Sequence, residues 1–298
     1  MSTTLIIIIP YWHGDAYFPA CLQSIAGSTF EDEVSWSLLI VHNGGSAPPV
    51  PPEFVAQVTI LKTVENIGFA RAINVGLQYT FRKQYDFIAL LNQDTILHTH
   101  CLQLLIRATD ISPAFYTPLI MNYDMDRVPS WYAMKYYPHI SFPSKGTIHE
   151  LQSMSATCVL GTQKSFLVGG FFDPVFYMYY EDDDYFSRFR SKGGKLFLVT
   201  SAKVGHFGGS TESLQKTSAL RKRTGVLKYM VRHSASWALL KKLMRHYGSC
   251  ILRLDFRRLF RYLHCDAHML PMVGYLRTAT YETIQTRAQE YIQSDANP

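Results

Sequence analysis

Short apolar runs that alternate with segments of helical periodicity are the feature that most limits the folds open to this chain. The runs are rich in leucine and β-branched residues and occupy residues 5–9, 38–41, 59–61 and 87–91. Apolar residues at helical spacing fall between them, at 16–25 and 70–81. Because a strand buried on both faces is continuously apolar, this rhythm predicts an α/β fold with a mostly parallel sheet flanked by helices.

The chain is long enough for one large core or two modest ones, since 47% of its 298 residues are hydrophobic. We expect no membrane-spanning helix, because no stretch approaches roughly 20 continuous apolar residues. Residues 5–9 lack the basic flank and cleavage site of a secretory signal and predict a buried first strand. The five cysteines are widely spaced without a CxxC pair, which indicates free thiols and a cytoplasmic location.

The charge is divided unevenly along the chain. Residues 219–298 hold 14 lysines and arginines against 5 acidic residues, whereas residues 1–218 hold 15 against 18. Apolar positions in the tail, such as Leu227, Val231, Leu259 and Leu263, recur at helical spacing among the basic ones. We therefore predict a catalytic domain at 1–218 and a basic amphipathic helical extension at 219–298.

Two roles of these helices are compatible with each other. Their apolar stripe can pack on the catalytic domain while the arginines lie in water. The same helices can attach the protein peripherally to an anionic membrane face, such as the inner face of the cell membrane. Nucleic-acid binding ranks last because no recognisable nucleic-acid module accompanies the charge.

Polar residues follow the predicted strands at the edge of the sheet where ligands gather in open α/β folds. They are Tyr11, His42 and Asn43, Asn66 to Gly68, and Asn92 to Asp94. Gly68 precedes a predicted helix, so it is either a structural turn or an approach for a phosphate. Asn92 and Asp94 lie two residues apart after a buried strand, so their side chains point to one side and can share an ion.

Six elements in order resemble glycosyltransferase family 2, particularly its bacterial rhamnosyltransferase-like branch, over roughly residues 3–215. They are Ile9-Pro-Tyr11 with His42 to Ser46, Glu65 to Gly76, Leu91 to Asp94, Gly169 to Asp173, Glu181 to Asp184, and Val204 to His206 with Ser210. The resemblance implies the GT-A fold, a Rossmann-like sheet whose first half holds a nucleotide and whose second half receives the acceptor.

The resemblance also implies a donor site and a metal site. Tyr11 is expected to stack on the base, and the other expected donor-binding residues are His42, Asn43, Asn66, Gly68, Arg71, Asn74, Asn92 and Gln93. Asp94 and His206 are expected to bind Mg²⁺ or Mn²⁺ at the donor diphosphate, whose developing charge a metal can neutralise. His42 replaces the family's usual aspartate, which leaves the nucleotide base open.

The family's Glu-Asp-x-Asp pattern aligns Asp182 with the catalytic base and Glu181 and Asp184 with supporting acids. These acids open a helical pattern that Gly193 ends, so Asp183 is interpreted as a helix cap. Residues 111–150 are expected to be irregular and aromatic. Trp131, Tyr132 and Tyr179 are the expected acceptor contacts, with packing of a surface insertion as the alternative for the first two.

The predicted function is inverting transfer of a sugar from a nucleotide diphosphate donor to a hydroxyl of a growing surface polysaccharide on a lipid carrier. Resemblance favours dTDP-rhamnose, and a galactofuranosyl or hexosyl transferase that uses a UDP-sugar is the alternative. A nucleotidyltransferase would need a basic glycine-rich loop after the first strand, which residues 10–15 lack. A non-catalytic sugar-nucleotide-binding protein would not need Asp94, Asp182 and His206.

Overall fold

The computed structural model describes residues 2–30, 33–141, 148–208, 218–234 and 236–295. Its strands are β1 (Thr3–Tyr11), β2 (Val34–His42), β3 (Val58–Lys62), β4 (Phe87–Leu91), β5 (Thr95–Leu97), β6 (Ala114–Asn122), β7 (Ile148–Glu150), β8 (Cys158–Thr162) and β9 (Lys195–His206). Within the described residues they form one sheet in the order β3-β2-β1-β4-β8-β6-β9-β5, with β7 paired to β9. The four strands predicted from apolar runs are confirmed as β1 to β4, which are mutually parallel.

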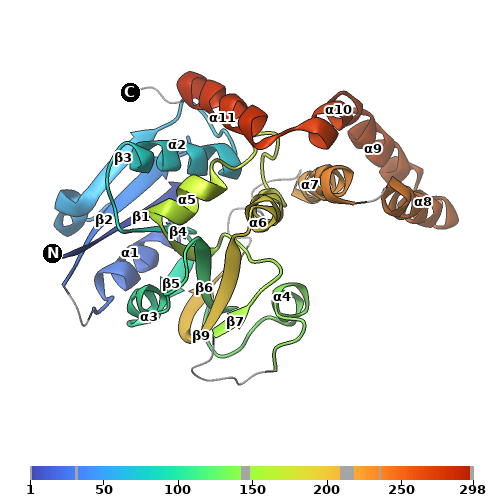
Figure 1. Ribbon diagram of the computed structural model, residues 1–298. Coiled ribbons are helices and arrows are strands. Elements are labelled where there is room, and N and C mark those ends of the chain that lie inside the picture. Colours follow the sequence, from blue (N-terminus) through green and yellow to red (C-terminus); the bar gives the residue numbers. More distant parts are fainter. Residues whose placement is uncertain (1, 31–32, 142–147, 209–217, 235, 296–298) are drawn as a thin grey trace.

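Helices cover both faces of this sheet (Figure 1). Those of the first 218 residues are α1 (Phe18–Ala26), the short 3-10 helix η1 (Pro52–Gln57), α2 (Phe69–Phe81), α3 (Cys101–Arg107), α4 (Ser130–Tyr136), α5 (Gln163–Gly169) and α6 (Glu181–Ser191). The tail adds α7 (Ser218–His233), α8 (Ser236–Leu252), α9 (Phe256–Ala267), α10 (Leu270–Thr278) and α11 (Tyr281–Asp295). The predicted α/β fold with a basic helical extension is therefore confirmed. None of the described helices is long and apolar enough to cross a membrane.

The segment 111–150 was expected to be irregular, and this expectation is wrong, because the segment contains α4, β7 and the long strand β6. This strand is buried along nearly its whole length and pairs in parallel with β9. Pro118 lies in its middle, which argues against a central strand because proline has no N–H to donate. The pairing shifts register at this point, since Pro118 lies opposite Val199 but Leu119 lies opposite Lys203. The irregularity lets a buried strand tolerate the proline.

The tail packs against the rest of the chain through α7, α10 and α11. A buried cluster joins Val175 and Phe176, which precede α6, to Leu227 and Val231 of α7 and Leu276 of α10. On α11, Ile284 and Ala288 are fully buried. The packing role predicted for the apolar stripe is thus confirmed for α7, while the division into domains at residue 218 stays a prediction.

A buried ion-pair network joins α6 to α7. Oδ1 of the fully buried Asp184 accepts from Arg232 at 2.8 Å and from His233 at 2.9 Å, and Oδ2 accepts from Arg188 at 2.8 Å. Arg232 also donates to Asp173 at 2.6 Å. Burial by itself would raise the pKa of Asp184, but Arg188, His233 and Arg232 outweigh it and hold that pKa below its usual range. The carboxyl group of Asp184 is therefore ionised at neutral pH and forms a true ion pair with Arg232.

Asp184→Asn is expected to lower the free energy of unfolding by about 3–5 kcal/mol at pH 7, because it removes the buried carboxylate that pairs with Arg188 and one of the two that pair with Arg232. The folded pKa lies below the usual 3.8, so this contribution is complete above about pH 4 and is lost as the pH falls further. Urea titrations at several pH values would measure it. The exposed Asp126→Asn is the matched control, and equal stability of the two variants would contradict the prediction.

Candidate functional site

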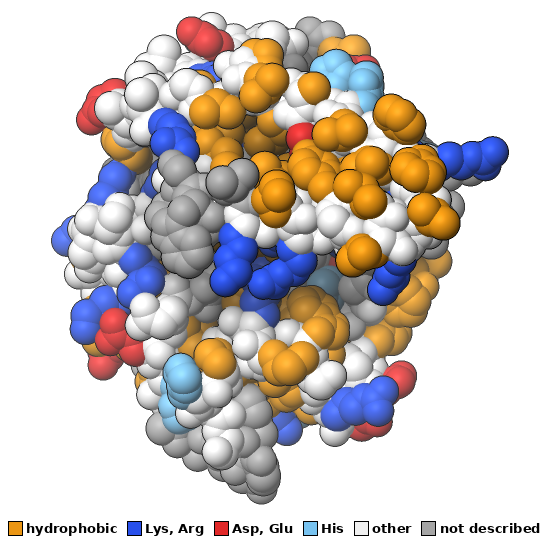
Figure 2. Space-filling model, turned by 90° about the vertical axis from the view of Figure 1, so that its right-hand side faces the viewer, with side chains coloured by type: hydrophobic (Ala, Val, Ile, Leu, Met, Phe, Trp, Pro, Cys, Tyr) orange, Lys and Arg blue, Asp and Glu red, His pale blue; other side chains and the backbone are white. Residues whose placement is uncertain are grey.

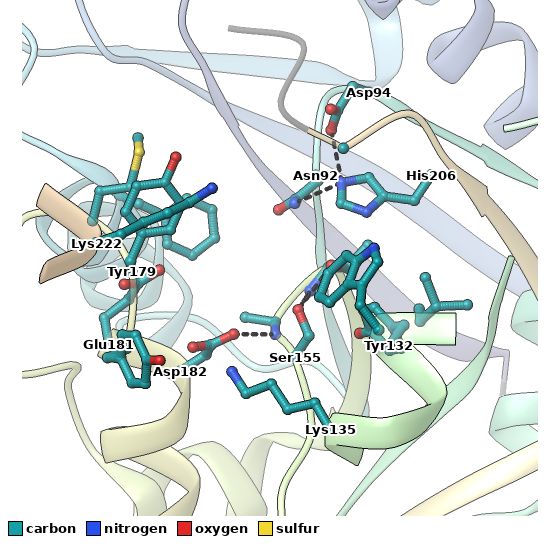
Figure 3. A pocket seen from close by; sticks show the side chains of 18 of the residues that line it. Asn92, Asp94, Tyr132, Lys135, Ser155, Tyr179, Glu181, Asp182, His206 and Lys222 are labelled. Atoms are coloured by element: carbon teal, nitrogen blue, oxygen red, sulfur yellow. Dashed lines mark hydrogen bonds and ion pairs between the residues drawn. The ribbon is translucent and has the colours of Figure 1, made fainter. Parts of the chain in front are cut away.

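A cavity of about 1080 Å³ opens where the carboxyl ends of β1 and β4 meet the start of α6 and the tail (Figure 3). Most of the predicted site residues line it. They are Asn43, Asn66, Asn92, Gln93, Asp94, Trp131, Tyr132, Tyr179, Glu181, Asp182 and His206. The ends of parallel strands, an aromatic helix and an acidic helix start therefore face one space.

Asp94 and His206 meet because β5 and β9 pair, with Thr95 opposite His206. The Nε2 atom of His206 lies 3.3 Å from Oδ1 of Asp94 and 3.5 Å from Nδ2 of Asn92. The other amide atom, Oδ1 of Asn92, is buried and has no hydrogen-bond partner. Ser210, which belongs to the same sequence motif as His206, lies outside the described residues.

The chemistry of this group fits a divalent cation. Carboxylate, amide oxygen and imidazole are ligands that Mg²⁺ or Mn²⁺ accepts, and the side chain of Asn92, whose Nδ2 lies 3.5 Å from His206, carries a buried amide oxygen without a partner. Among the residues that the structure describes, no three His, Cys, Asp or Glu side chains are grouped to hold a metal. A cation at Asp94 and His206 would therefore need further oxygen atoms from a bound molecule.

Two amide side chains hold the loops around the cavity. The side chain of Gln93 accepts from the backbone N–H of Trp12 at 2.8 Å and donates to its carbonyl at 2.9 Å. The side chain of Asn43 accepts from the backbone N–H of Ile67 at 2.9 Å and donates to Oδ1 of Asn66 at 3.2 Å. These contacts position the loops that follow β1 and precede α2.

The structural interpretation of Gly68 is favoured over phosphate binding. Its φ of +88° lies in the left-handed region, and an added Cβ would lie 2.4 Å from the carbonyl oxygen of Tyr177. The next N–H, that of Phe69, donates to the same oxygen at 2.8 Å. Gly68 therefore brings the start of α2 against the loop before α6, and it lies outside the cavity lining.

Tyr11 and His42, both predicted to contact the base, do not line the cavity. The ring of Tyr11 is fully buried 4.9 Å from that of Phe18, and its hydroxyl donates to Asp15 at 2.9 Å. Stacking on a base is therefore not available to Tyr11 in this structure. The Nδ1 atom of His42 is buried without a hydrogen-bond partner, so it retains a free polar group beside this ring.

Arg71 and Asn74 on α2, which were predicted to bind the donor, also lie outside the cavity lining. The guanidinium of Arg71 lies 3.5 Å from the ring centroid of Tyr291 on α11. The buried side chain of Asn74 donates to the carbonyl of Phe172 and accepts from its N–H, both at 2.8 Å. Arg71 therefore connects α2 to α11, and Asn74 connects α2 to the loop before α6.

The acids at the start of α6 have different environments. Asp183 forms an ion pair with Lys135 at 2.7 Å, and Asp184 belongs to the buried network with Arg232, so Asp184 is structural and not a supporting acid of the cavity. Asp182 and Glu181 line the cavity. Burial, followed by the charge of Asp183, raises the pKa of Asp182 to about 6.

Glu181 carries a still more perturbed carboxyl group. Burial, followed by the charge of Asp182, raises its pKa well above the usual range, and its Oε2 atom is buried without a hydrogen-bond partner. Asp182 instead accepts from the backbone N–H groups of Asp183 at 2.9 Å and Ala156 at 3.4 Å. The carboxylate of Asp182 therefore has backbone donors that stabilise its ionised form, whereas the Oε2 atom of Glu181 has none.

Aromatic side chains line the same cavity. Trp131 is 57% exposed, whereas the ring of Tyr132 is buried against it at 5.1 Å. Tyr179 and Tyr180 have positive φ angles of 70° and 68° directly before α6, an uncommon backbone conformation for such residues. Trp131 is thus free to contact a ligand, and Tyr132 supports it.

Sequence reasoning missed the contribution of the tail to this cavity. Its residues in the lining are Ala219, Lys222, Arg223, Val226, Lys242, His246, Arg258 and Tyr262. Lys135 from α4 was also missed. The excess of basic residues after residue 218 indicated that the tail is basic, but it could not indicate which of these side chains face the cavity.

A protein-family model described as Glycosyl transferase family 2 matches residues 6–172. No curated protein matches the sequence. Among solved structures, GalNAc-T7 with UDP, GalNAc and Mn²⁺ is 13% identical with a TM-score of 0.55, over 76% of this chain and 47% of that one. S. aureus TarS 1-349 in complex with UDP-GlcNAc is 14% identical with a TM-score of 0.54, over 99% and 92%.

The chain spans about half the length of the GalNAc-T7 chain and of the longer TarS chain, of which it covers 47% and 55%. At identities of 13% and 14%, these neighbours establish the fold and nothing finer. That fold is GT-A, as expected from the sequence.

Proposed function

The chain belongs to glycosyl transferase family 2, and from this premise we propose that it transfers a sugar, with inversion, from a nucleotide diphosphate donor to a saccharide hydroxyl. The observation that carries the proposal is one cavity that contains both the Asp94–His206 pair and the ionisable Asp182. The two groups match the two requirements of the reaction. The charge that develops on the leaving diphosphate must be neutralised, and a proton must be removed from the acceptor hydroxyl.

The donor is proposed as dTDP-rhamnose, which the resemblance to the rhamnosyltransferase-like branch supports. A UDP-sugar is the second candidate, because the solved neighbours are described with UDP and UDP-GlcNAc. The acceptor is proposed as a growing surface polysaccharide on a lipid carrier. Trp131, which is largely exposed at the cavity, offers an aromatic face for an acceptor sugar.

Asp182 is proposed as the catalytic base. Inverting transfer is a single displacement, in which the acceptor oxygen attacks the anomeric carbon from the side opposite the leaving diphosphate. The carboxylate of Asp182 would accept the hydroxyl proton, while the backbone N–H groups of Asp183 and Ala156 orient it. A divalent cation held by Asp94 and His206 would supply charge neutralisation at the leaving diphosphate.

The metal assignment predicts that Asp94→Ala and His206→Ala each lower the rate of transfer by more than about 10-fold. Loss of a residue that only orients a metal ligand already costs about 10–100-fold. The same variants should lose the Mn²⁺-dependent thermal shift produced by UDP, dTDP or their sugars. A panel of these nucleotides also distinguishes the two proposed donors. Asp126→Ala serves as the surface control, and normal turnover in the presence of EDTA would disprove the metal site.

The base assignment predicts that Asp182→Asn keeps the binding of nucleotide and Mn²⁺ but loses transfer by about 10²–10⁴-fold. In the unmodified protein the carboxylate must be ionised, so kcat should be constant well above pH 6 and fall about tenfold per pH unit below it. A pH–rate profile measures this. If Asp182→Asn is active and Glu181→Gln inactive, the base is Glu181.

We further propose that the tail docks on an anionic membrane through α8, α9 and the start of α10. Figure 2 faces this side of the molecule, where hydrophobic side chains gather with lysine and arginine side chains beside them. The apolar ridge consists of Met244, Ile251, Leu252, Leu254, Phe256, Phe260, Leu263 and Leu270, which are 44–87% exposed. The exposed Arg253, Arg257 and Arg261 alternate with them, so an anionic bilayer complements the ridge in both polarity and charge.

The membrane assignment predicts that Leu252→Ser/Leu254→Ser/Phe260→Ser abolishes sedimentation with vesicles that contain phosphatidylglycerol. Binding of the unmodified protein should weaken as salt is added and be weak on phosphatidylcholine alone, because part of the attraction is electrostatic. Val55→Ser/Val64→Ser, at exposed positions outside the tail, is the matched control. If the protein ignores anionic vesicles, or the triple variant instead changes a dimer to a monomer, the ridge is not a membrane surface.

A further inference from the structure

The side of the cavity that the tail supplies is basic. Lys222 and Arg223 on α7, Lys242 on α8 and Arg258 on α9 line it, and we call these four residues the cationic wall. Among the described tail residues in the lining, none is acidic. The wall faces a cavity that already holds the predicted donor and base residues, so its charge acts on whatever binds there.

Side-chain contacts hold much of this wall in place. Arg223 forms an ion pair with Asp266 and contacts Nδ1 of His246 at 2.7 Å. Its guanidinium also lies 4.0 Å from the ring centroid of Tyr262, whose hydroxyl accepts from Arg258 at 2.8 Å. Three helices of the tail therefore present preorganised donors, which lowers the entropy lost when an anion binds.

Positive charge is crowded in the inner part of the wall, where Arg223 is buried and Lys242 is half-buried, whereas Lys222 and Arg258 are exposed. Burial, followed by the charge of Arg223, lowers the pKa of both Lys242 and His246. Crowding of this kind disfavours the charged forms, and a bound anion relieves it. Phosphate groups meet the requirement best, because arginine and lysine side chains bind their oxygens through strong, charge-assisted hydrogen bonds.

The position of the wall indicates which substrate carries that anion. In Figure 3, Lys222 and Tyr179 lie on one side of the cavity and Asp94 with His206 on the other, while Asp182 projects into it from α6. In a single displacement, the acceptor approaches from the side opposite the leaving diphosphate. Because Asp94 and His206 are proposed to serve that diphosphate, the side where Lys222 lies is the acceptor side. The volume of about 1080 Å³ slightly exceeds the roughly 300–1,000 Å³ typical of sites for one small ligand.

We infer that the cationic wall binds a phosphate or diphosphate group carried by the acceptor, an inference that rests on the proposed transferase function. Two sources share this chemistry. The group can link the acceptor sugar to a lipid, or it can be part of the saccharide itself. In both cases the tail helices select an anionic acceptor, while Asp94 and His206 serve the donor.

The test measures binding by calorimetry to the full-length protein with its donor site saturated by UDP or dTDP and Mn²⁺. Decyl phosphate below its micelle concentration represents the lipid-linked source, and glucose 1-phosphate represents the saccharide source. Lys222→Gln/Lys242→Gln should weaken the better probe by at least about tenfold, since two charged contacts are lost. Lys241→Gln/Arg245→Gln is the control, because it removes two tail charges outside the cavity lining.

The possible results distinguish the inference about the cationic wall from the proposed transferase function. Nucleotide binding that is unchanged in Lys222→Gln/Lys242→Gln, together with a weakened probe, supports the inference, and the better probe identifies the source. If saturating nucleotide abolishes probe binding, or if the variant loses nucleotide affinity instead, the wall serves the donor and the inference is overturned while the proposed function stands. Failure of the unmodified protein to bind any nucleotide would overturn the proposed function itself.

Discussion

The buried ion pairs around Asp184 and Arg232 are the interaction on which the rest of the site depends. Arg232 comes from the tail, yet it compensates two buried carboxylates, Asp184 on α6 and Asp173 in the preceding loop. An unpaired buried charge is strongly unfavourable, so α6, this loop and α7 are fixed relative to one another. The start of α6, where Asp182 lies, is therefore positioned by a residue some fifty positions later in the chain.

Neighbouring acids on α6 acquire opposite properties from this arrangement. Asp184 points into the arginine network, which lowers its pKa, whereas Asp182 faces the cavity, where burial and Asp183 raise its pKa to about 6. Lys135 pairs with Asp183 and limits that rise. Two positions of one helical turn thus carry an acid that stabilises the fold and an acid suited to accept a proton near neutral pH.

The tail packs on the core, lines the cavity and exposes an apolar face, and its sequence did not show which residues serve each role. Leu227 and Val231 of α7 close a buried cluster, while the inward faces of α7, α8 and α9 line the cavity. The outward face of α8 and α9 exposes large apolar residues, among them Leu252 and Phe260. If that face meets a membrane, as we propose, the cavity lies beside the bilayer from which a lipid-linked acceptor would arrive.

The sequence by itself determined the parallel strands β1 to β4, the helix that begins at Glu181 and the family, because burial on both faces, capping and short motifs are local patterns. The tertiary structure decided what depends on distant partners. It made β6 a central strand despite Pro118, and it turned Asn74 toward Phe172 and away from the cavity. It also brought Lys222 and Arg258 to the cavity, since helical periodicity indicates that a side is apolar or basic but not what that side will meet.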